Sequence, residues 1–440
     1  MAEDAKQARL AEDALTTYSP SVHLNLNVRG LGLSATLEIN ERSAALQAEG
    51  RTISRLGLGQ SPFPVPDVLQ RALKDNAHQK DYLAVQGLPA LRAAVCRYIK
   101  RTQDLDFDPE DILIGPGSKE LMFLVQLVYY GDLVIPTPSW VSYAPQARIL
   151  GRPITWLPTR PETGLGVTAE ALRAVCADDP LRPRLLILNS PGNPTGTAYT
   201  PEALSDIAAA AREHRLLLLS DEIYGGVQFD GRPQSAARFY RGGTIISDGI
   251  SKWAGSGGWR LGFFAFPKSL AWLRKAMAAA ASETYTSVSA PIQHAAIAAF
   301  DGGPEMALYL DRSRKVLHAL ADHVAERLSR AGARVNPIKG GFYAFPDFEP
   351  LRGRLTARGV TTSRALCDRL LEEAGVAALP GSAFGRPDHE LSLRLAFVDF
   401  DGADALDALA AGETLDAAFL KRHCGRVVEG IEAMARWAEG

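Results

Sequence analysis

The sequence has little of what marks several large classes of protein. Its four cysteines, Cys96, Cys176, Cys367 and Cys424, lie far apart in 440 residues, with no CxxC pair and no histidine at metal-ligand spacing. We therefore expect reduced, structural thiols and no metal site. An excess of one charge is also lacking, because 48 basic and 50 acidic side chains give a net charge of −2. Nucleic acid and anionic lipid surfaces are poor partners for such a chain.

Long apolar runs and a targeting segment are missing as well. No stretch approaches the roughly 20 apolar residues that a membrane-spanning helix needs. The start, Met1–Lys6, is polar and lacks the basic and then apolar order of a secretory signal. We therefore expect a cytoplasmic protein without a membrane partner, in which residues 1 to 22 form a mobile or loosely docked arm.

What the chain does contain is an alternation of short apolar runs, turn residues and helical periodicity. Ile112–Ile114, Leu133–Ile135, Leu185–Asn189 and Leu216–Ser220 are too short for helices, whereas Pro201–Glu213 is typical of one. This alternation predicts an α/β fold in which wholly apolar strands lie in the buried middle of a mostly parallel sheet. Helices on both faces would give a large domain of three layers.

A second domain is expected, because 440 residues exceed the size at which single cores stop growing. Near Phe300 the pattern changes to long helical stretches followed by strand-like pieces. We predict an N-terminal arm and part of the small domain over 1–60, a large cofactor-binding domain over 61–300, and a smaller α+β domain over 301–440.

One run carries the strongest chemical signal. In Gly249–Gly262 a single lysine, Lys252, is surrounded by small residues and followed eight positions later by Arg260. A lysine amine can form a Schiff base with an aldehyde, and glycines let the backbone approach a ligand closely. Pyridoxal phosphate has both an aldehyde and a phosphate. A surface loop with one solvated lysine is the alternative that a short motif leaves open.

Other residues could hold the ring of such a cofactor. Asp221, which ends a strand, could keep the ring nitrogen protonated, although many aspartates in this position only cap a helix. Asn193 and Tyr224 could donate to the phenolic oxygen, and Trp140 could stack on the ring. A turn asparagine and core aromatic residues are the plainer alternatives for these three.

The phosphate has a candidate site of its own. Gly117, Ser118 and Lys119 open a helix directly after a strand, where free backbone NH groups and the helix dipole favour an anion. A turn of this kind also caps helices that bind nothing. All these candidates, however, follow strand ends, and open parallel sheets bind ligands at the carboxyl ends of their strands. Their joint order favours pyridoxal phosphate.

These motifs together resemble those of the class I/II aminotransferases, fold type I pyridoxal phosphate enzymes close to the aspartate and aromatic aminotransferases. The resemblance extends from about Ser34 to the C-terminus. The matching pieces are Tyr82 with Gly87–Arg92, Gly117–Lys119, Pro138–Tyr143, Asn193–Gly196, Asp221–Tyr224, Ser251–Lys252 with Gly258–Gly262, Gly341–Tyr343, Pro380–Gly381 and Leu393–Leu395. The implied fold is that of a fold type I transferase.

The resemblance also implies roles for single residues. Lys252, Asp221 and Tyr224 would be catalytic, with Lys252 holding the cofactor and later moving a proton. The cofactor-binding set would be Tyr82 from a second subunit of a homodimer, Gly117, Ser118, Lys119, Trp140, Asn193, Asp221, Tyr224, Ser251, Lys252 and Arg260. The substrate-binding set would be Gly59, Trp140, Asn193 and Arg394. The fork of Arg394 suits the bidentate pairing of an alpha-carboxylate.

The implied activity is the transfer of an amino group between an amino acid and a 2-oxo acid through the Lys252 Schiff base. An alternative is a non-transaminating enzyme of specialised metabolism, similar to the aminocyclopropane carboxylate synthases. Such an enzyme would eliminate, replace, cyclise or join carbon atoms, with S-adenosylmethionine as one candidate substrate. A ligand-sensing module is a third alternative, but the chain keeps its lysine and has no basic helix-turn-helix segment at its N-terminus.

Two departures from the family pattern limit what can be said of the substrate. Ser256 replaces a usual apolar residue, and Gln60–Phe63 replaces a loop that usually carries an acidic residue. We expect both to touch the pocket wall or its lid. Because no second arginine can be assigned to a side-chain carboxylate, aspartate specificity is not predicted.

Overall fold

The computed structural model describes residues 25–32 and 35–440, so the predicted arm over 1–22 lies outside the described residues. Seven strands form the large sheet. In spatial order they are β2 (Ile112–Gly115), β8 (Gly262–Ala265), β7 (Thr244–Gly249), β6 (Leu217–Asp221), β5 (Arg184–Asn189), β3 (Asp132–Thr137) and β4 (Ile154–Pro158). Within this sheet β8 alone runs against its neighbours, and the pairs from β7 to β4 are all parallel. The expected mostly parallel sheet is confirmed.

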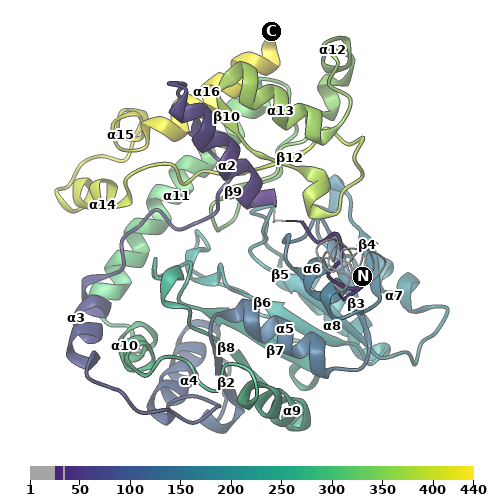
Figure 1. The fold of residues 1–440 in the computed structure, drawn as a ribbon, viewed down its shortest axis with the longest axis vertical. Coiled ribbons are helices and arrows are strands. Elements are labelled where there is room, and N and C mark those ends of the chain that lie inside the picture. The colour runs from purple at the N-terminus through teal and green to yellow at the C-terminus, as the bar shows by residue number, and fades with distance from the viewer. Residues whose placement is uncertain (1–24, 33–34) are drawn as a thin grey trace, which may run out of the picture.

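Helices cover both faces of this sheet and give the expected three layers (Figure 1). One face carries α5 (Ser118–Val128), α6 (Tyr143–Ile149) and α9 (Ala271–Ser282). The other carries α4 (Pro89–Gln103), α7 (Ala169–Cys176), α8 (Pro201–Glu213) and α10 (Ala290–Asp301). Along β3, Leu133 and Ile135 join the core of the first face and Val134 joins that of the second. Successive side chains of a strand point to opposite faces, so an unbroken apolar run serves both cores.

The placement predicted for one strand is wrong. We expected Ile112–Ile114 in the parallel middle of the sheet, but β2 lies at its edge and pairs antiparallel with β8. The chain returns from β7 to β8 through the short Lys252 run, and Gly249 pairs with Gly262. The connection contains one short turn of 3-10 helix, Gly257–Trp259, and no α-helix of the kind that usually carries a crossover between parallel strands. The Lys252 run is therefore a closed loop between two paired strands.

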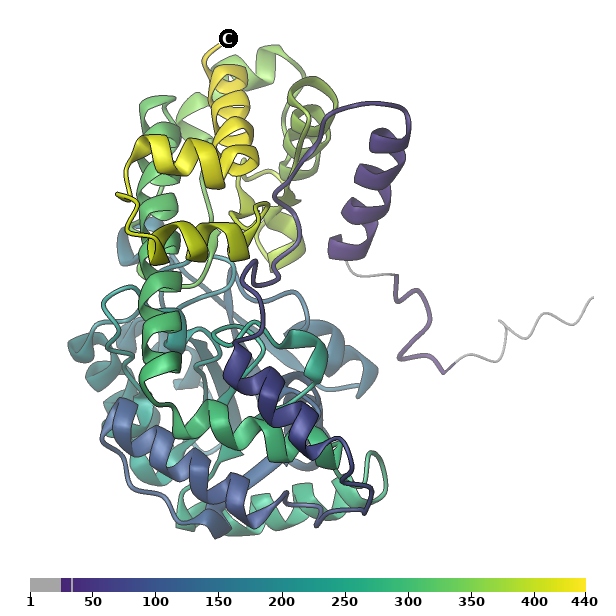
Figure 2. The same cartoon turned by 90° about the vertical axis from the view of Figure 1, so that its left-hand side faces the viewer.

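A smaller unit stands above the large sheet in the view of Figure 1. It holds an antiparallel sheet in the order β11 (Leu379–Pro380), β12 (Leu393–Ala396) and β9 (Tyr343–Ala344). Its helices include α12 (Arg352–Ala357), α13 (Ser363–Ala374), α14 (Gly402–Ala410), α15 (Ala417–His423) and α16 (Gly425–Glu439). The long helix α11 (Pro304–Arg330) runs up from the large unit into the smaller one (Figures 1 and 2).

The N-terminal part of the described chain belongs with the smaller unit. Helix α2 (Ala35–Ala48) stands beside it in both views (Figures 1 and 2), and β1 (Ser54–Arg55) pairs in parallel with β10 (Val376–Ala377). Helix α3 (Asp67–Asn76) then packs on α10 of the large unit. Our division at residues 60 and 300 stays a prediction. Among the described residues, no helix is both long and apolar enough to cross a membrane.

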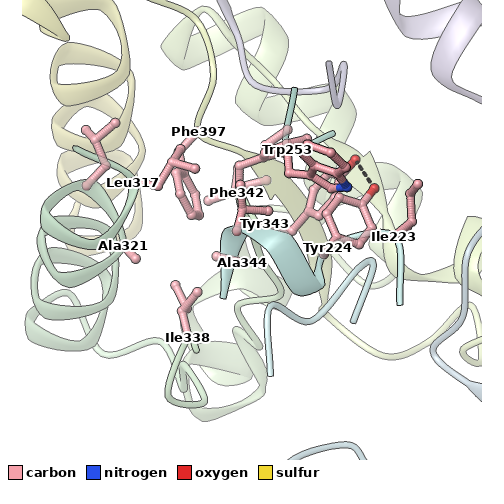
Figure 3. Packing of buried hydrophobic residues seen from close by; sticks show 14 of the residues in the cluster. Ile223, Tyr224, Trp253, Leu317, Ala321, Ile338, Phe342, Tyr343, Ala344 and Phe397 are labelled. Atoms are coloured by element: carbon pink, nitrogen blue, oxygen red, sulfur yellow. Dashed lines mark hydrogen bonds between the residues drawn. The ribbon is translucent and has the colours of Figure 1, made fainter. Parts of the chain in front are cut away.

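A continuous apolar core connects the two units and reaches the strand ends where ligands are expected. In Figure 3, Leu317 and Ala321 of α11 face Phe342 and Phe397 of the smaller unit. The same cluster includes Tyr224, which follows β6 of the large sheet. Residues at this junction are therefore held from both sides by apolar packing.

Candidate active site

Most of the predicted site residues line one cavity of about 540 Å³ at the carboxyl ends of the large sheet's strands. The predicted residues in its wall are Gly59, Gly117, Ser118, Lys119, Trp140, Asn193, Asp221, Tyr224, Ser251, Lys252, Arg260 and Arg394. Loop residues Leu58, Gln60 and Ser61 also line it. The expectation that this loop touches the pocket is thus confirmed for Gln60 and Ser61.

Tyr82 is the one predicted residue that the fold does not bring to this cavity. It follows α3 in an exposed loop, and 91% of its surface is accessible. In the family pattern this residue acts from a second subunit, so its distance from its own chain's cavity fits the prediction without testing it.

Lys252 lies in the loop after β7, with its amine inside the cavity. Its Nζ donates a hydrogen bond to the carbonyl of Gly59 at 3.1 Å, and the rings of Tyr224 and Phe342 lie 5.8 and 5.7 Å from it. The loop is held tightly, since a side chain at Gly255 would meet the carbonyl of Phe63 at 2.6 Å. A lysine held among aromatic rings and backbone carbonyls is suited to meeting an aldehyde in the cavity.

Ser256 does not lie on the pocket wall, so that expectation is wrong. Its side chain is buried, it is not among the residues that line the cavity, and its hydroxyl donates to the carbonyl of Ile250 at 2.8 Å. Serine fits here because the backbone turns back on itself and leaves a carbonyl that needs a donor. Ser256 therefore closes the loop that carries Lys252.

An anion-binding cradle forms where α5 begins. Gly117 is the N-cap at φ +86°, no side chain caps the helix, and a Cβ at this position would lie 2.5 Å from Arg260 Nη2. Arg260 reaches the carbonyls of Gly257 and Pro116, at 2.8 and 3.3 Å. Free helix amides beside a guanidinium fit a phosphate, and only glycine leaves room for that approach.

The cavity contains more positive than negative charge. Lys119 Nζ lies 5.2 Å from the centre of the Trp140 ring, and burial, together with Arg260 and Lys252, lowers the pKa of Lys119. Among the described residues, no ion pair with a carboxylate is found for these three cations. Cations that lie close together in a partly buried cavity repel one another, and anionic ligands would reduce this repulsion.

Asp221 ends β6 and supplies the cavity's carboxylate. It is 3% exposed, and it accepts hydrogen bonds from the Tyr143 hydroxyl at 2.5 Å and the Ile223 amide at 3.4 Å. Burial raises the pKa of Asp221 to about 6, while these two donors and Lys252 act in the opposite direction. Among the described residues, no cation forms an ion pair with Asp221, and a protonated ring nitrogen would supply that partner.

Tyr143 was missed from the sequence, although it lies in one of the matching pieces. It is fully buried on α6 and packs edge-on against Trp140, with 5.3 Å between ring centres. A tyrosine three residues after the expected stacking tryptophan was an available signal, since residues at this spacing share one side of a helical turn. It orients the carboxylate of Asp221.

Two further buried acids lie behind Asp221 and were also missed. Glu222 accepts hydrogen bonds from Gln103 and Ser220 at 2.5 and 2.7 Å, and burial raises its pKa to about 7. Asp248 accepts from the Gly249 amide and the Tyr98 hydroxyl, and burial raises its pKa strongly. Glu222 follows Asp221 in the chain and Asp248 follows its strand neighbour Ser247, so three carboxyl groups whose burial favours the protonated form lie close together.

Arg394 forms the opposite end of the cavity. It lies on β12, is 2% exposed, and donates to the Gly57 carbonyl and, at 3.4 Å, to Asn193 Oδ1. Its Nε has no hydrogen-bond partner in the described part of the chain, and burial lowers the pKa of the guanidinium. A buried guanidinium with an unused donor is expected to bind a carboxylate, because an unpaired buried charge is costly.

Asn193, Tyr224 and Tyr343 lie between these two ends. Asn193 Nδ2 donates to the Tyr224 hydroxyl over a long 3.5 Å, and that hydroxyl lies 3.1 Å from the hydroxyl of Tyr343. Tyr343 was noted only as part of a matching piece and had no predicted role. Its place beside Tyr224 depends on how the smaller unit packs on the large one.

Comparison with known proteins agrees with this geometry. The model of the family described as Aminotransferase class I and II matches residues 51–406. An aspartate aminotransferase from Bacillus sp. is 33% identical over 82% of this chain and 91% of its own length. An aspartate/prephenate aminotransferase from Cereibacter sphaeroides is 32% identical over 80% of this chain and 89% of its own.

Solved structures agree as well. The aspartate aminotransferase from Thermus thermophilus with maleate has a TM-score of 0.77 at 29% identity, over 88% of this chain and 99% of that one. The aspartate aminotransferase from Rhizobium meliloti has a TM-score of 0.81 at 27% identity, over 94% and 99%. The matches span nearly the whole of these enzymes.

Proposed function

The chain belongs to the aminotransferase class I and II family and is an aminotransferase, and we propose that Lys252 holds its pyridoxal 5′-phosphate. The family uses this cofactor, and the residues of the cavity fit it. One observation carries the proposal: Lys119, Lys252, Arg260 and Arg394 share a cavity of about 540 Å³ with a single ring-facing acid, Asp221. Anions at both ends and a cationic ring between them would balance these charges.

The cofactor would lie between the two ends of the cavity. Ser118, Ser251, Arg260 and the free amides of α5 would hold its phosphate. Asp221 would pair with the ring nitrogen, Tyr224 and Asn193 would donate to the phenolic oxygen, and Trp140 would cover the ring. When bound, the group supplies an aldehyde that captures amines and a ring that withdraws electrons from the substrate's alpha carbon.

The residues of this chain would then transfer one proton of the substrate. The Lys252 amine, freed when the substrate's amine takes its place, would become a general base that removes the alpha proton and delivers it to the carbon on the far side of the nitrogen. In the absence of a ligand, the Gly59 carbonyl holds Nζ at 3.1 Å. Burial disfavours the charge of Asp221, so a positive partner would stabilise its ionised form.

Arg394 would orient the substrate. Its unpartnered Nε and its two other nitrogens can receive an alpha-carboxylate in bidentate geometry. The Gly57 carbonyl and Asn193 hold the guanidinium in place before the substrate arrives. Gly59 lies in the same loop and leaves space for the carboxylate, since a side chain at this position would overlap the Tyr343 hydroxyl.

We propose that acidic amino acids are among the donors. Several similar proteins are named aspartate aminotransferases, and Lys119, near Trp140, is a cation of this cavity to which we assign neither the phosphate nor the alpha-carboxylate. The pKa of this partly buried lysine is lowered, so a side-chain carboxylate beside it would relieve the cost of its charge. No observation favours the elimination or cyclisation alternatives.

The assembly and location are also proposals. We propose a homodimer in which the exposed Tyr82 completes the phosphate site of the second subunit. The four cysteines are all unpaired, which is consistent with our expectation of the cytoplasm.

The test of the reaction is a panel of amino donors with 2-oxoglutarate or oxaloacetate, followed by absorbance and mass spectrometry. We expect aspartate to give its 2-oxo acid and the acceptor to gain the amino group. Lys252→Ala should lower turnover by at least about a thousandfold, since general acid-base catalysis contributes that much. Lys268→Ala, an exposed lysine paired with Asp108, is the matched control. Full turnover by Lys252→Ala would refute the assignment.

The donor class is tested separately through Lys119. Lys119→Met should lower kcat/KM for aspartate about tenfold or more, because a partly buried charge pair is lost. The value for alanine should change little, as alanine has no side-chain carboxylate. Lys315→Met on the exposed face of α11 serves as control. Equal losses for both donors would contradict the role in side-chain recognition.

A further inference from the structure

Tyr343 lies where the two units and the loop before the large domain meet. It is buried on β9, and its hydroxyl lies 3.1 Å from the hydroxyl of Tyr224, as the dashed line in Figure 3 marks. The two rings pack edge-on, with 5.5 Å between their centres and 83° between their planes. The contact therefore joins the smaller unit to the residue that we place at the phenolic oxygen.

The hydroxyl groups of Tyr224 and Tyr343 can form only a few hydrogen bonds. A tyrosine hydroxyl has one proton to donate and can accept at its oxygen. The Tyr224 oxygen already has a donor in Asn193 Nδ2, at 3.5 Å. If Tyr343 also donates to it, the proton of Tyr224 has to go to a third group in the cavity. If Tyr343 accepts instead, that proton is used between the two tyrosines.

The surroundings of Tyr343 favour donation. Its other acceptor is the Gly59 carbonyl at 3.4 Å, a longer contact than the one to Tyr224. The Arg394 guanidinium lies 4.8 Å above the Tyr343 ring. A cation over the ring holds it in place and makes its hydroxyl a better donor.

We propose that Tyr343 is a positioning residue that donates its proton to Tyr224 and thereby directs the Tyr224 proton to the phenolic oxygen of the cofactor. This inference rests on the proposed function, because it needs a ligand oxygen in front of Tyr224. It adds a role for the smaller unit, because Tyr343 on its strand β9 would change the negative charge on the cofactor's phenolic oxygen through Tyr224. Arg394, on the neighbouring strand β12, links the same tyrosine to the substrate's carboxylate.

The test is a pH titration of the visible absorbance band of the holoenzyme. Without a directed donor, the ring oxygen keeps more negative charge and holds the proton on the Lys252 nitrogen more strongly. Tyr343→Phe keeps the ring and removes only the hydroxyl. We expect it to raise the titration midpoint by about 0.5 to 1 pH unit, the scale of one neutral hydrogen bond.

A double-substitution cycle separates positioning from a direct effect. Tyr224→Phe should raise the midpoint more than Tyr343→Phe, and the double variant should match Tyr224→Phe alone, because Tyr343 acts only through Tyr224. Tyr129→Phe is the matched control, since its hydroxyl donates to the Arg184 carbonyl at 3.5 Å and lies on a buried residue outside the cavity. We expect no shift for this control.

Two outcomes would overturn the proposal. One is an unchanged midpoint in Tyr343→Phe when Tyr224→Phe shifts it, and the other is additive shifts in the double variant. The KM for aspartate gives a second readout, which should change by less than about twofold in Tyr343→Phe because the ring under Arg394 remains. A wild-type protein without a visible band would instead count against the proposed cofactor.

Discussion

The two ends of the cavity are built in different ways. The end that we assign to the cofactor takes Gly117, Asp221 and Lys252 from loops that follow strands of one sheet. The other end takes Arg394 and Tyr343 from a second sheet, together with a loop around residue 59. The first end is fixed once the large sheet forms. The second exists only when the smaller unit is docked.

The electrostatics of the two ends differ as well. Behind Asp221 lie Glu222 and Asp248, so that three buried carboxyl groups have raised pKa values. At the other end Arg394 is buried among aromatic rings and its pKa is lowered. Each end thus contains a charge whose burial is unfavourable until a partner of opposite sign arrives. The cofactor should stabilise the first end, and the substrate's carboxylate should stabilise the second.

The largest expected effect comes from the cofactor end. Asp221→Asn removes the partner of the ring nitrogen, and we expect kcat to fall about a thousandfold, the upper range for losing one preorganised electrostatic group. Cofactor affinity, measured by equilibrium dialysis, should fall as well. Asp311→Asn, at an exposed ion pair on α11, is the control. A variant with lower affinity but wild-type kcat would show that Asp221 only binds.

In the cofactor-free protein, Asp221→Asn should raise the free energy of unfolding. Because the pKa of Asp221 rises from 3.8 to about 6, the native state holds the proton more tightly than the unfolded state. Stability therefore falls as the pH rises from 3.8 to about 6. Asp221→Asn should remove this loss and stabilise the cofactor-free protein at pH 7.5 by up to about 3 kcal/mol. Urea unfolding measures it, and a destabilised variant would contradict the assignment.

The substrate end should show the next largest effect. Arg394→Lys keeps the charge but loses the fork, and we expect kcat/KM to fall about a hundredfold through KM. Cofactor affinity should change by less than about threefold, since the guanidinium does not belong to the cofactor end. The half-buried pair Arg352 and Glu349, which lies outside the cavity, offers Arg352→Lys as control. A large loss of cofactor affinity would mean that the two ends are not separable.

A pair of glycines gives a sharper comparison. A Cβ at Gly117 would lie 2.5 Å from Arg260, and a Cβ at Gly59 would lie 1.9 Å from the Tyr343 hydroxyl. Gly117→Ala should weaken cofactor binding about tenfold, and Gly59→Ala should raise KM by a similar factor, the usual scale of overpacking. Gly353→Ala is the control, because nothing lies within 4 Å of its added Cβ. A loss of cofactor affinity in Gly59→Ala, together with a raised KM in Gly117→Ala, would contradict the assignment of the two ends.

The smallest effect is expected at Ser256, which supports the Lys252 loop from behind. Ser256→Ala loses the hydrogen bond to Ile250 and should lower the free energy of unfolding by about 1 kcal/mol. KM values should stay within about twofold, because the side chain does not line the cavity. Ser282→Ala, which loses an exposed hydrogen bond, should cost less. A change in the preferred amino donor would contradict this placement and indicate that Ser256 contacts the pocket.

The fold was predictable where local pattern and topology act together. Apolar runs such as Leu185–Asn189 and Leu216–Ser220 became β5 and β6, because strands buried on both faces need apolar side chains throughout. The edge position of β2 was not predictable, since nothing local reports that β8 returns antiparallel. Pairing partners are chosen by long-range contacts that a run of residues does not encode.

The candidate groups at the end that we assign to the cofactor were identifiable in the sequence. Lys252, Asp221, Asn193 and Arg260 carry charged or amide groups after recognisable strands, and parallel strands bring their carboxyl ends to one edge. The side chains that support them became visible once the chain was folded. Tyr143 under Asp221, Tyr343 beside Tyr224 and Ser256 behind Lys252 act through packing between distant segments. A tyrosine or serine gives no local sign of its partner, because a hydroxyl becomes functional only through the group that the fold sets before it.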